Sequence, residues 1–176
     1  MEAYYDTDLT ATEHKILRYA AGKVKDNPES FPKVSFTVHE FLSAGGVSGD
    51  GYYSRFYKIA DELSKKRIKI KTEKSTGWIP WLASLFYEDG EVQLTFNTVI
   101  KELLLDLDGQ FTKYDYKHIG NMRSAYTIRL FELLKQYAPI GKRRLRVDVL
   151  RNMLGTEGKY KQYGQFKLRV LKQAQK

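Results

Sequence analysis

The order of elements in this chain occurs twice, and this internal repeat restricts the folds that the sequence can adopt. Val38 and Gly46 bound a short apolar stretch, and Val147 and Gly155 bound a second stretch of the same length. A strand-like end precedes each stretch, and a basic helix is predicted after each. A short helix, a glycine-containing turn and a charged second helix form the helix-turn-helix arrangement, which places one helix in the DNA major groove. The repeat therefore predicts two DNA-binding units in tandem.

The helical part of the first unit is predicted from capping signals and periodicity. Thr10 and Glu13 have the spacing of a capping box at the start of a helix. The apolar stripe of this helix comprises Ile16, Leu17, Ala20 and Val24. A short strand over 34–38, a short helix over 39–44 and a longer helix over 52–67 are expected to follow.

Strand-like segments follow the longer helix of the first unit. Residues 68–72 and 92–96 alternate apolar and polar side chains, and residues 78–87 are aromatic and β-branched. A turn is predicted at Glu88-Asp89-Gly90. These segments predict a β-hairpin or meander that forms the wing of a winged helix, followed by a helix that Asn97 caps.

The periodic pattern breaks between Asp108 and Asn121, and we place the domain boundary there, between residues 115 and 116. The second unit is predicted to contain a helix over 126–137, a short strand over 144–147, and helices over 148–154 and 163–176. No wing follows Lys176. The predicted fold class is therefore α+β, with tandem winged-helix domains at 1–115 and 116–176, the second truncated before its wing.

Charge is distributed unevenly between the two units. The whole chain has a formal net charge of +9, and residues 135–176 carry 12 Lys+Arg against 2 Asp+Glu, a net charge of +10. Such a basic segment favours a polyanionic partner, and its position places the phosphate-binding surface in the second unit.

Several classes of function are disfavoured by what the sequence lacks. Cysteine is absent, which excludes disulfides and thiolate chemistry. His14, His39 and His118 are scattered and show no metal-ligand spacing, so we expect no catalytic site, no metal and no cofactor. No apolar run approaches the roughly 20 residues of a membrane helix, and no signal peptide is apparent. A cytoplasmic protein without enzymatic activity is the expectation.

One segment of the second unit is similar to a known protein family. The run from Tyr126 to Tyr137, Tyr-Thr-Ile-Arg-Leu-Phe-Glu-Leu-Leu-Lys-Gln-Tyr, resembles the iteron-binding plasmid replication initiators, and the similarity continues through 150–155, 159–163 and 166–171. Residues 96–97 and 109–114 also fit. The resemblance implies a bacterial plasmid initiator whose monomer binds repeated sites at a replication origin and whose first domain also mediates dimerisation. We expect this chain to recognise repeated double-stranded DNA at such an origin, and to act by binding and by recruiting host replication proteins.

The final helix contains the candidate base-reading residues. Gln165, Arg169 and Lys172, followed by Lys176, recur on the side opposite an apolar stripe of Tyr163, Phe166, Val170 and Ala174. Gln pairs with adenine and Arg with guanine through two hydrogen bonds, so this stripe has the chemistry to contact bases. The alternative from the pattern alone is an ordinary solvated charged face.

Phosphate contacts are predicted from cations on both units. In the second unit they are Lys142, Arg143, Arg144, Arg146, Lys161 and Lys167, and in the first they are Arg55, Lys58 and Lys65. A basic loop that only aids solubility is the alternative for 142–146, and an exposed helical surface is equally compatible with the first-unit set, because Asp61 and Glu62 interrupt it.

The first unit is also predicted to form a homodimer that is in equilibrium with the monomer. Its strand over 92–96 presents Val92, Leu94 and Phe96, which we assign to the dimer interface. Trp78, Trp81, Phe86 and Tyr87 are interpreted as core residues in preference to a single-stranded DNA platform. The rival to an origin-binding initiator is a truncated module that dimerises through the first domain and regulates the full-length initiator.

Overall fold

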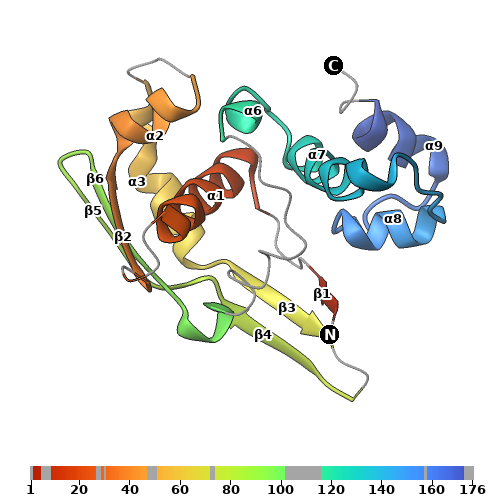
Figure 1. The fold of residues 1–176 in the computed structure, drawn as a ribbon, viewed down its shortest axis with the longest axis horizontal. Coiled ribbons are helices and arrows are strands. Elements are labelled where there is room, and N and C mark those ends of the chain that lie inside the picture. The colour runs from red at the N-terminus through yellow and green to blue at the C-terminus, as the bar shows by residue number, and fades with distance from the viewer. Residues whose placement is uncertain are drawn as a thin grey trace.

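The fold consists of two units joined by a short helix. A computed structural model describes residues 2–4, 9–26, 29, 31–46, 51–71, 74–101, 116–156 and 158–172. Both units combine short helices with tight turns, and strands occur in the first unit only among these described residues. Figure 1 shows the sheet-containing unit and the helical unit side by side, with α6 (Lys117–Gly120) between them.

The elements follow the predicted order closely. The first unit contains β1 (Glu2–Tyr4), α1 (Ala11–Asp26), β2 (Lys33–Thr37), α2 (Val38–Ala44), α3 (Gly51–Ser64), β3 (Arg67–Lys71), β4 (Thr76–Pro80), β5 (Leu82–Glu88) and β6 (Glu91–Phe96). The second contains α7 (Ala125–Tyr137), α8 (Val147–Met153), α9 (Tyr163–Phe166) and a π-helical segment over Lys167–Leu171. Part of the predicted domain boundary region, residues 102–115, lies outside the described residues, so the boundary stays a prediction.

The strands form two separate antiparallel sheets instead of one meander. One sheet has the order β2-β6-β5, and the other has the order β1-β3-β4. The tight turn at Asp89 and Gly90, both at positive φ, joins β5 to β6. Only this hairpin pairs with β2, so the wing is β5–β6, whereas β3 and β4 form a hairpin that projects from the unit (Figure 1).

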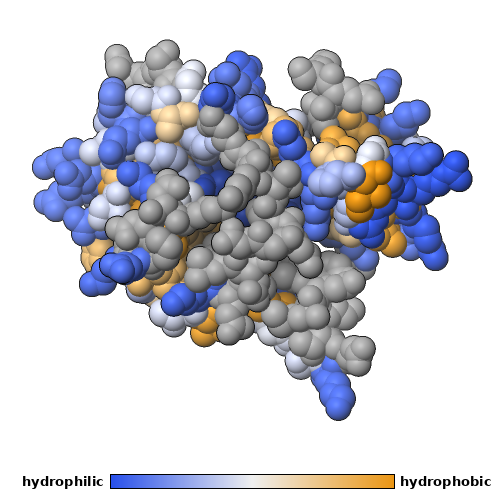
Figure 2. All heavy atoms as spheres, viewed as in Figure 1, coloured by the Kyte–Doolittle hydropathy of each residue, from blue (hydrophilic) through white to orange (hydrophobic). Residues whose placement is uncertain are grey.

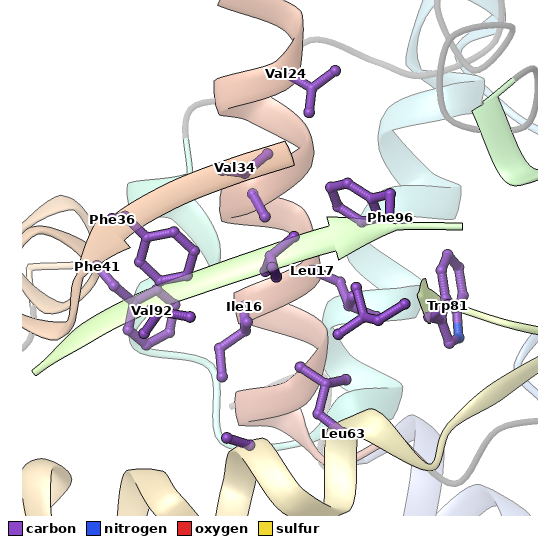
Figure 3. Packing of buried hydrophobic residues seen from close by; sticks show 14 of the residues in the cluster. Ile16, Leu17, Val24, Val34, Phe36, Phe41, Leu63, Trp81, Val92 and Phe96 are labelled. Atoms are coloured by element: carbon purple, nitrogen blue, oxygen red, sulfur yellow. The ribbon is translucent and has the colours of Figure 1, made fainter. Parts of the chain in front are cut away.

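The first core lies between α1, α2 and α3 on one side and the β2-β6-β5 sheet on the other. The predicted stripe of α1 is buried, with Ile16 and Ala20 at 0% exposure. Figure 3 shows this stripe packed against side chains from β2 and β6, with Leu63 of α3 and Trp81 closing the cluster. The capping box at the start of α1 is confirmed, because the Thr10 amide donates to Glu13 Oε2 at 2.7 Å and the Glu13 amide donates to Thr10 Oγ1 at 3.3 Å.

The structure contradicts the prediction that the apolar face of β6 is available as a dimer surface. Val92, Leu94 and Phe96 are 0–1% exposed and belong to the first core, as Figure 3 shows for Val92 and Phe96. Strand β6 is also the central strand of its sheet, so its backbone is paired on both edges. The alternation that made this strand look amphipathic reflects a buried inner face and a polar outer face of the same monomer.

The second unit has a much smaller core. Leu133, Leu154, Phe166 and Val170 are buried in it, and partly buried side chains of α7 and α8 surround them. The strand predicted over 144–147 is absent: residues 142–146 have no regular structure and α8 begins at Val147. Arg146 is extended, but no strand among the described residues of this unit lies beside it to complete a ladder.

Apolar side chains remain exposed on the second unit. Figure 2 shows hydrophobic atoms among strongly hydrophilic ones over α7–α9. The large exposed ones are Leu134, Ile140, Val147, Val149, Tyr163 and Leu168. Their exposure follows from the lack of a covering sheet among the described residues of this unit.

Candidate nucleic-acid interface

The two helix-turn-helix units have the same local geometry at their first helix and turn. Helices α2 and α8 are each seven residues long and begin at Val38 and Val147. The turns that end them place Gly46 at φ +64° and Gly155 at φ +65°. Only glycine adopts this left-handed backbone without steric penalty, which explains the repeated glycine. The predicted repeat is therefore confirmed at the level of backbone conformation.

The two first helices differ in how they begin. Thr37 and Glu40 form a complete capping box on α2, with Thr37 Oγ1 accepting from the Glu40 amide at 3.0 Å and the Thr37 amide donating to Glu40 Oε2 at 2.6 Å. Arg146 occupies the equivalent position before α8 and makes no side-chain cap. The capping signal at Thr37 is readable in the sequence as a Thr three residues before a Glu, and our sequence reasoning missed it.

Helix α3 is the second helix of the first unit. Its inner face buries Phe56, Ala60 and Leu63, while Arg55 and Lys58 are exposed. Lys65, just after the helix, is exposed but its ammonium lies 2.6 Å from Asp61 Oδ2 and 3.5 Å from Glu62 Oε1. The charge of Lys65 is therefore partly compensated within the protein.

Helix α9 and the π-helical segment after it form the second helix of the second unit. Phe166 and Val170 are buried as predicted, but Tyr163 is 52% exposed. The amide of Lys172 donates to Lys167 O at 2.9 Å, five residues back. This wider turn changes the angular spacing on which the predicted stripe rests.

The candidate base-reading side chains are all exposed. Gln165, Arg169 and Lys172 each have an exposed side chain, and Lys176 lies outside the described residues, as does Ala174 of the predicted apolar stripe. Lys161 and Lys167, assigned to phosphate contact, are exposed on the same segment. Their contact with DNA stays a prediction.

The basic loop over 142–146 precedes α8. Lys142, Arg143 and Arg144 are exposed, and the guanidinium carbon of Arg143 lies 4.1 Å from the centre of the Tyr137 ring. Arg146 makes a two-pronged ion pair with Asp148, at 3.1 and 2.9 Å. Stacking holds the Arg143 side chain in place without neutralising it, whereas Asp148 partly compensates Arg146. Among the described residues the loop therefore presents three exposed cations, Lys142, Arg143 and Arg144, for which no ion pair is seen, just before α8 begins.

Arg151, which packs against the second helix of the second unit, was not identified from the sequence. The guanidinium carbon of Arg151 lies 5.0 Å from the centre of the buried Phe166 ring, and the Arg151 carbonyl accepts from the Thr156 amide and hydroxyl. Arg151 thus links α8 to the turn and to α9 by packing. A single Arg in a basic segment gives no sequence signal for such a role.

Alternative kinds of site find no support in the described part of the chain. Within it, no group of three or more His, Asp or Glu side chains is placed to hold a metal ion. Within the same residues, no helix is long and apolar enough to cross a membrane. Trp81 is buried, whereas Trp78 and Phe86 are exposed on different sheets, so the four aromatic residues do not form one platform.

Comparisons with known proteins identify two initiator domains in the same order along the chain, and the first family model extends into α7. Residues 1–135 match the family model described as Initiator Replication protein, WH1, and residues 146–176 match the model described as Initiator Rep protein, WH2. A replication initiation protein of Escherichia coli is 23% identical over an alignment of 176 positions that covers 94% of this chain and 55% of that protein. This chain thus spans about half the length of that relative.

Two solved structures share the fold across nearly the whole chain. The Pi initiator protein in complex with iteron DNA has a TM-score of 0.65 at 15% identity, covering 98% of this chain and 82% of that one. Domains 2 and 3 of RctB have a TM-score of 0.61 at 10% identity, covering 93% of this chain and 67% of that one. The fold is therefore the α+β tandem winged-helix fold, with a short second domain.

Proposed function

This chain belongs to the initiator replication protein family, and we propose that it binds repeated double-stranded DNA sites at a plasmid origin and triggers replication without catalysis. The observation that carries the proposal is the pair of helix-turn-helix units joined in one molecule, with a net charge of +10 over residues 135–176 of the second unit. A replication initiator acting on plasmid DNA would work in the cytoplasm, with host replication proteins as further partners.

The two units are assigned different shares of the binding. The second unit presents Lys142, Arg143 and Arg144 before α8 and exposes Arg169 on its second helix. We assign base contact to Gln165, Arg169 and Lys172, because amide and guanidinium groups match base edges in the major groove. The first unit, whose Lys65 is engaged by Asp61 and Glu62, contributes auxiliary phosphate contacts through Arg55 and Lys58.

Selection from a random duplex library, followed by salt titration, tests this proposal. We expect the library to converge on one sequence, and a duplex with direct repeats of it to bind more tightly than a scrambled duplex. The logarithm of affinity should fall linearly with the logarithm of salt concentration on both duplexes, because counterions are released from phosphates. Failure to enrich any sequence would reject origin recognition by this chain.

A regulatory module that dimerises through the first unit remains the second candidate. One observation favours it: the outer strands β2 and β5 leave the β2-β6-β5 sheet with unpaired edges among the described residues, and Phe86 of β5 is 67% exposed. Sedimentation at increasing protein concentration distinguishes the candidates when combined with the selection. A dimer without sequence-specific binding would favour the regulatory module.

A further inference from the structure

A buried ion pair joins the two units. Arg18 of α1 donates to Glu132 of α7 through Nε at 2.6 Å and through Nη2 at 3.0 Å, although 114 positions separate them in the chain. The Glu132 side chain is 4% exposed and that of Arg18 is 11% exposed. Two parallel hydrogen bonds between a guanidinium and a carboxylate fix both distance and orientation. This pair therefore restricts how α7 lies on α1.

Glu132 also connects to the helix-turn-helix of its own unit. Arg129 Nη1 lies 3.1 Å from Glu132 Oε2, and Arg129 Nε donates to the carbonyl oxygen of Met153, the last residue of α8, at 3.2 Å. Burial alone would raise the pKa of Glu132, but the charges of Arg18 and Arg129 outweigh burial and the pKa is lowered overall. Glu132 thus stays ionised and bridges α1 to the end of α8.

The linker helix α6 is seated on the first unit next to this pair. Lys15 Nζ donates to the carbonyl oxygen of Gly120 at 2.5 Å, and Ile119 is fully buried. The backbones of Gly120 and Gly45 are packed so closely that a Cβ added to Gly120 would overlap the Gly45 carbonyl group. These contacts therefore fix the position at which the chain enters the second unit. One of them is made by Lys15, which lies on α1 three residues before Arg18.

We infer that Glu132 is a positioning residue that fixes the distance and angle between the two DNA-facing helices, α3 and α9. Helix α1, which carries Arg18, packs on α3, and α7, which carries Glu132, packs on the π-helical segment that continues α9. Each DNA-facing helix is therefore in contact with the helix that carries one member of the pair. This inference rests on the proposed function for its purpose, because a fixed separation sets which two stretches of one duplex are contacted together.

The energetics of buried ion pairs support a positioning role over a purely stabilising one. Desolvation of the two charges offsets much of their attraction, so a buried pair adds little net stability compared with apolar side chains of similar size. What such a pair does supply is a preference for one arrangement over others, because a displaced charge would be buried without a partner. Arg18 of the first unit and Arg129 of the second both contact Glu132, so these three charges favour one arrangement of the two units.

Distances between spin labels on the two units test the inference directly. The chain has no cysteine, so Tyr57→Cys on α3 and Leu168→Cys on the π-helical segment, which replace side chains 73% and 56% exposed, accept two nitroxide labels. In this doubly labelled chain, Arg18→Met removes the ion pair between the two units, while Glu132 keeps its ion pair with Arg129. Arg129→Met is the matched control, because it removes the Arg129–Glu132 ion pair within the second unit and leaves the Arg18–Glu132 ion pair between the units.

We expect the distribution of distances between the labels to have a single narrow maximum in the labelled background and in Arg129→Met. In Arg18→Met this single maximum should be lost. The circular dichroism spectrum should be unchanged in each variant. An unaltered narrow distance in Arg18→Met would overturn the inference, as would equal broadening in both variants. Arg18→Lys, which keeps the charge but only one hydrogen-bonding arm, should give an intermediate width, and it replaces Arg18→Met if that variant does not fold.

A binding experiment separates failure of this inference from failure of the proposed function. On a selected duplex, insertion of roughly 5 bp, half a helical turn, between the segments contacted by the two units should weaken binding of the unmodified chain more than that of Arg18→Met. If no duplex is preferred at all, the proposed function fails, and the label distances still decide whether Glu132 fixes the arrangement.

Discussion

The first and second helix-turn-helix units share their local geometry and differ in what surrounds it. Both have a seven-residue first helix, a glycine near φ +65° and a fully buried Phe on the second helix, Phe56 or Phe166. Among the described residues, the core of the first unit, which includes side chains of the β2-β6-β5 sheet, has twenty buried residues, whereas the core of the second has four. The comparison shows that short-range sequence is enough to specify this motif, while its burial depends on elements contributed from elsewhere.

This difference explains the division of labour that we propose. The first unit uses its apolar residues to bury a core and has balanced charges around α3, so it is suited to support and auxiliary contact. The second unit leaves apolar and cationic side chains exposed over a small core, so more of its surface is available to a partner. Its π-helical segment lies on the face assigned to DNA, and π turns are often found at functional sites.

The largest effect is expected from a charge placed on the inner face of β6. Leu94→Asp would bury a carboxylate in the first core without a partner, and we expect it to reduce the free energy of unfolding by more than about 4 kcal/mol. Gln93→Asp on the exposed outer face of the same strand is the control and should change it by less than about 0.5 kcal/mol. Urea denaturation measures both; a folded Leu94→Asp protein that only dissociates would restore this strand as a dimer surface.

Removal of the buried phenylalanine ring from each unit in turn should show that the two cores unfold independently. Phe166→Ala is expected to destabilise by about 3–5 kcal/mol, which a core of four buried residues cannot tolerate, so the second unit alone should unfold. Hydrogen exchange would then show lost protection in α7–α9 and retained protection in β2, β5 and β6. Phe56→Ala should instead lower protection throughout the first unit. Simultaneous loss in both units after Phe166→Ala would show that they fold as one.

Acid should weaken the protein at the junction between the units. Burial lowers the pKa of His14 from 6.5 to about 4, with the charge of Glu132 opposing and those of Arg18 and Arg129 reinforcing this effect. Because the unfolded chain binds a proton that the folded chain does not, stability should fall as pH decreases from 6.5 to about 4, by up to about 3 kcal/mol. The pKa of Glu132 is lowered from 4.5, so the unfolded chain binds a proton that the folded carboxylate does not, and a further loss of stability is expected as pH falls below 4.5.

Substitution of His14 provides the check on that pH dependence. His14→Gln has no group that titrates in this range, so its stability should vary less with pH between 6.5 and 4 than that of the unmodified chain. Thermal unfolding at several pH values measures the difference. Identical pH profiles for the two proteins would assign the acid sensitivity to other groups.

A smaller effect is expected from the helix caps that distinguish α2 from α8. Thr37→Ala removes the capping box of α2 and should destabilise the first unit by about 1 kcal/mol. Arg146→Ser would give α8 the cap it lacks and should stabilise the second unit by about 0.5–1 kcal/mol, less the loss of the Arg146–Asp148 pair. Denaturation curves that show no change for either substitution would mean that the caps do not account for the difference.

Local features of this molecule could be predicted from the sequence, and non-local ones could not. The capping box at Thr10, the α1 stripe and the turn glycines depend on residues a few positions apart, and all were predicted. The pairing of β1 with β3 and the Arg18–Glu132 contact join distant segments, for which periodicity gives no signal. The buried face of β6 was read as a partner surface because alternation shows that one face is apolar, without showing what covers it.

The candidate DNA surface was predictable in composition and less so in geometry. Charge counts located the basic surface in the second unit, and the exposed positions of Gln165, Arg169 and Lys172 agree with that assignment. The π turn at Lys167–Leu171 was not expected, since the sequence there has ordinary helical periodicity. Partial neutralisation of Lys65 and Arg146 depends on how neighbouring carboxylates are oriented, which the sequence does not specify.

The most direct test of the account compares matched charge removal in the two units. One protein would carry Lys142→Gln, Arg143→Gln and Arg144→Gln, and the other Arg55→Gln, Lys58→Gln and Lys65→Gln, with binding to the selected repeat duplex measured across salt concentrations. We predict that the second-unit protein loses roughly two to three units of the slope of log affinity against log salt, and the first-unit protein clearly less. An equal or larger loss for the first-unit protein would contradict the assignment of DNA contact mainly to the second unit.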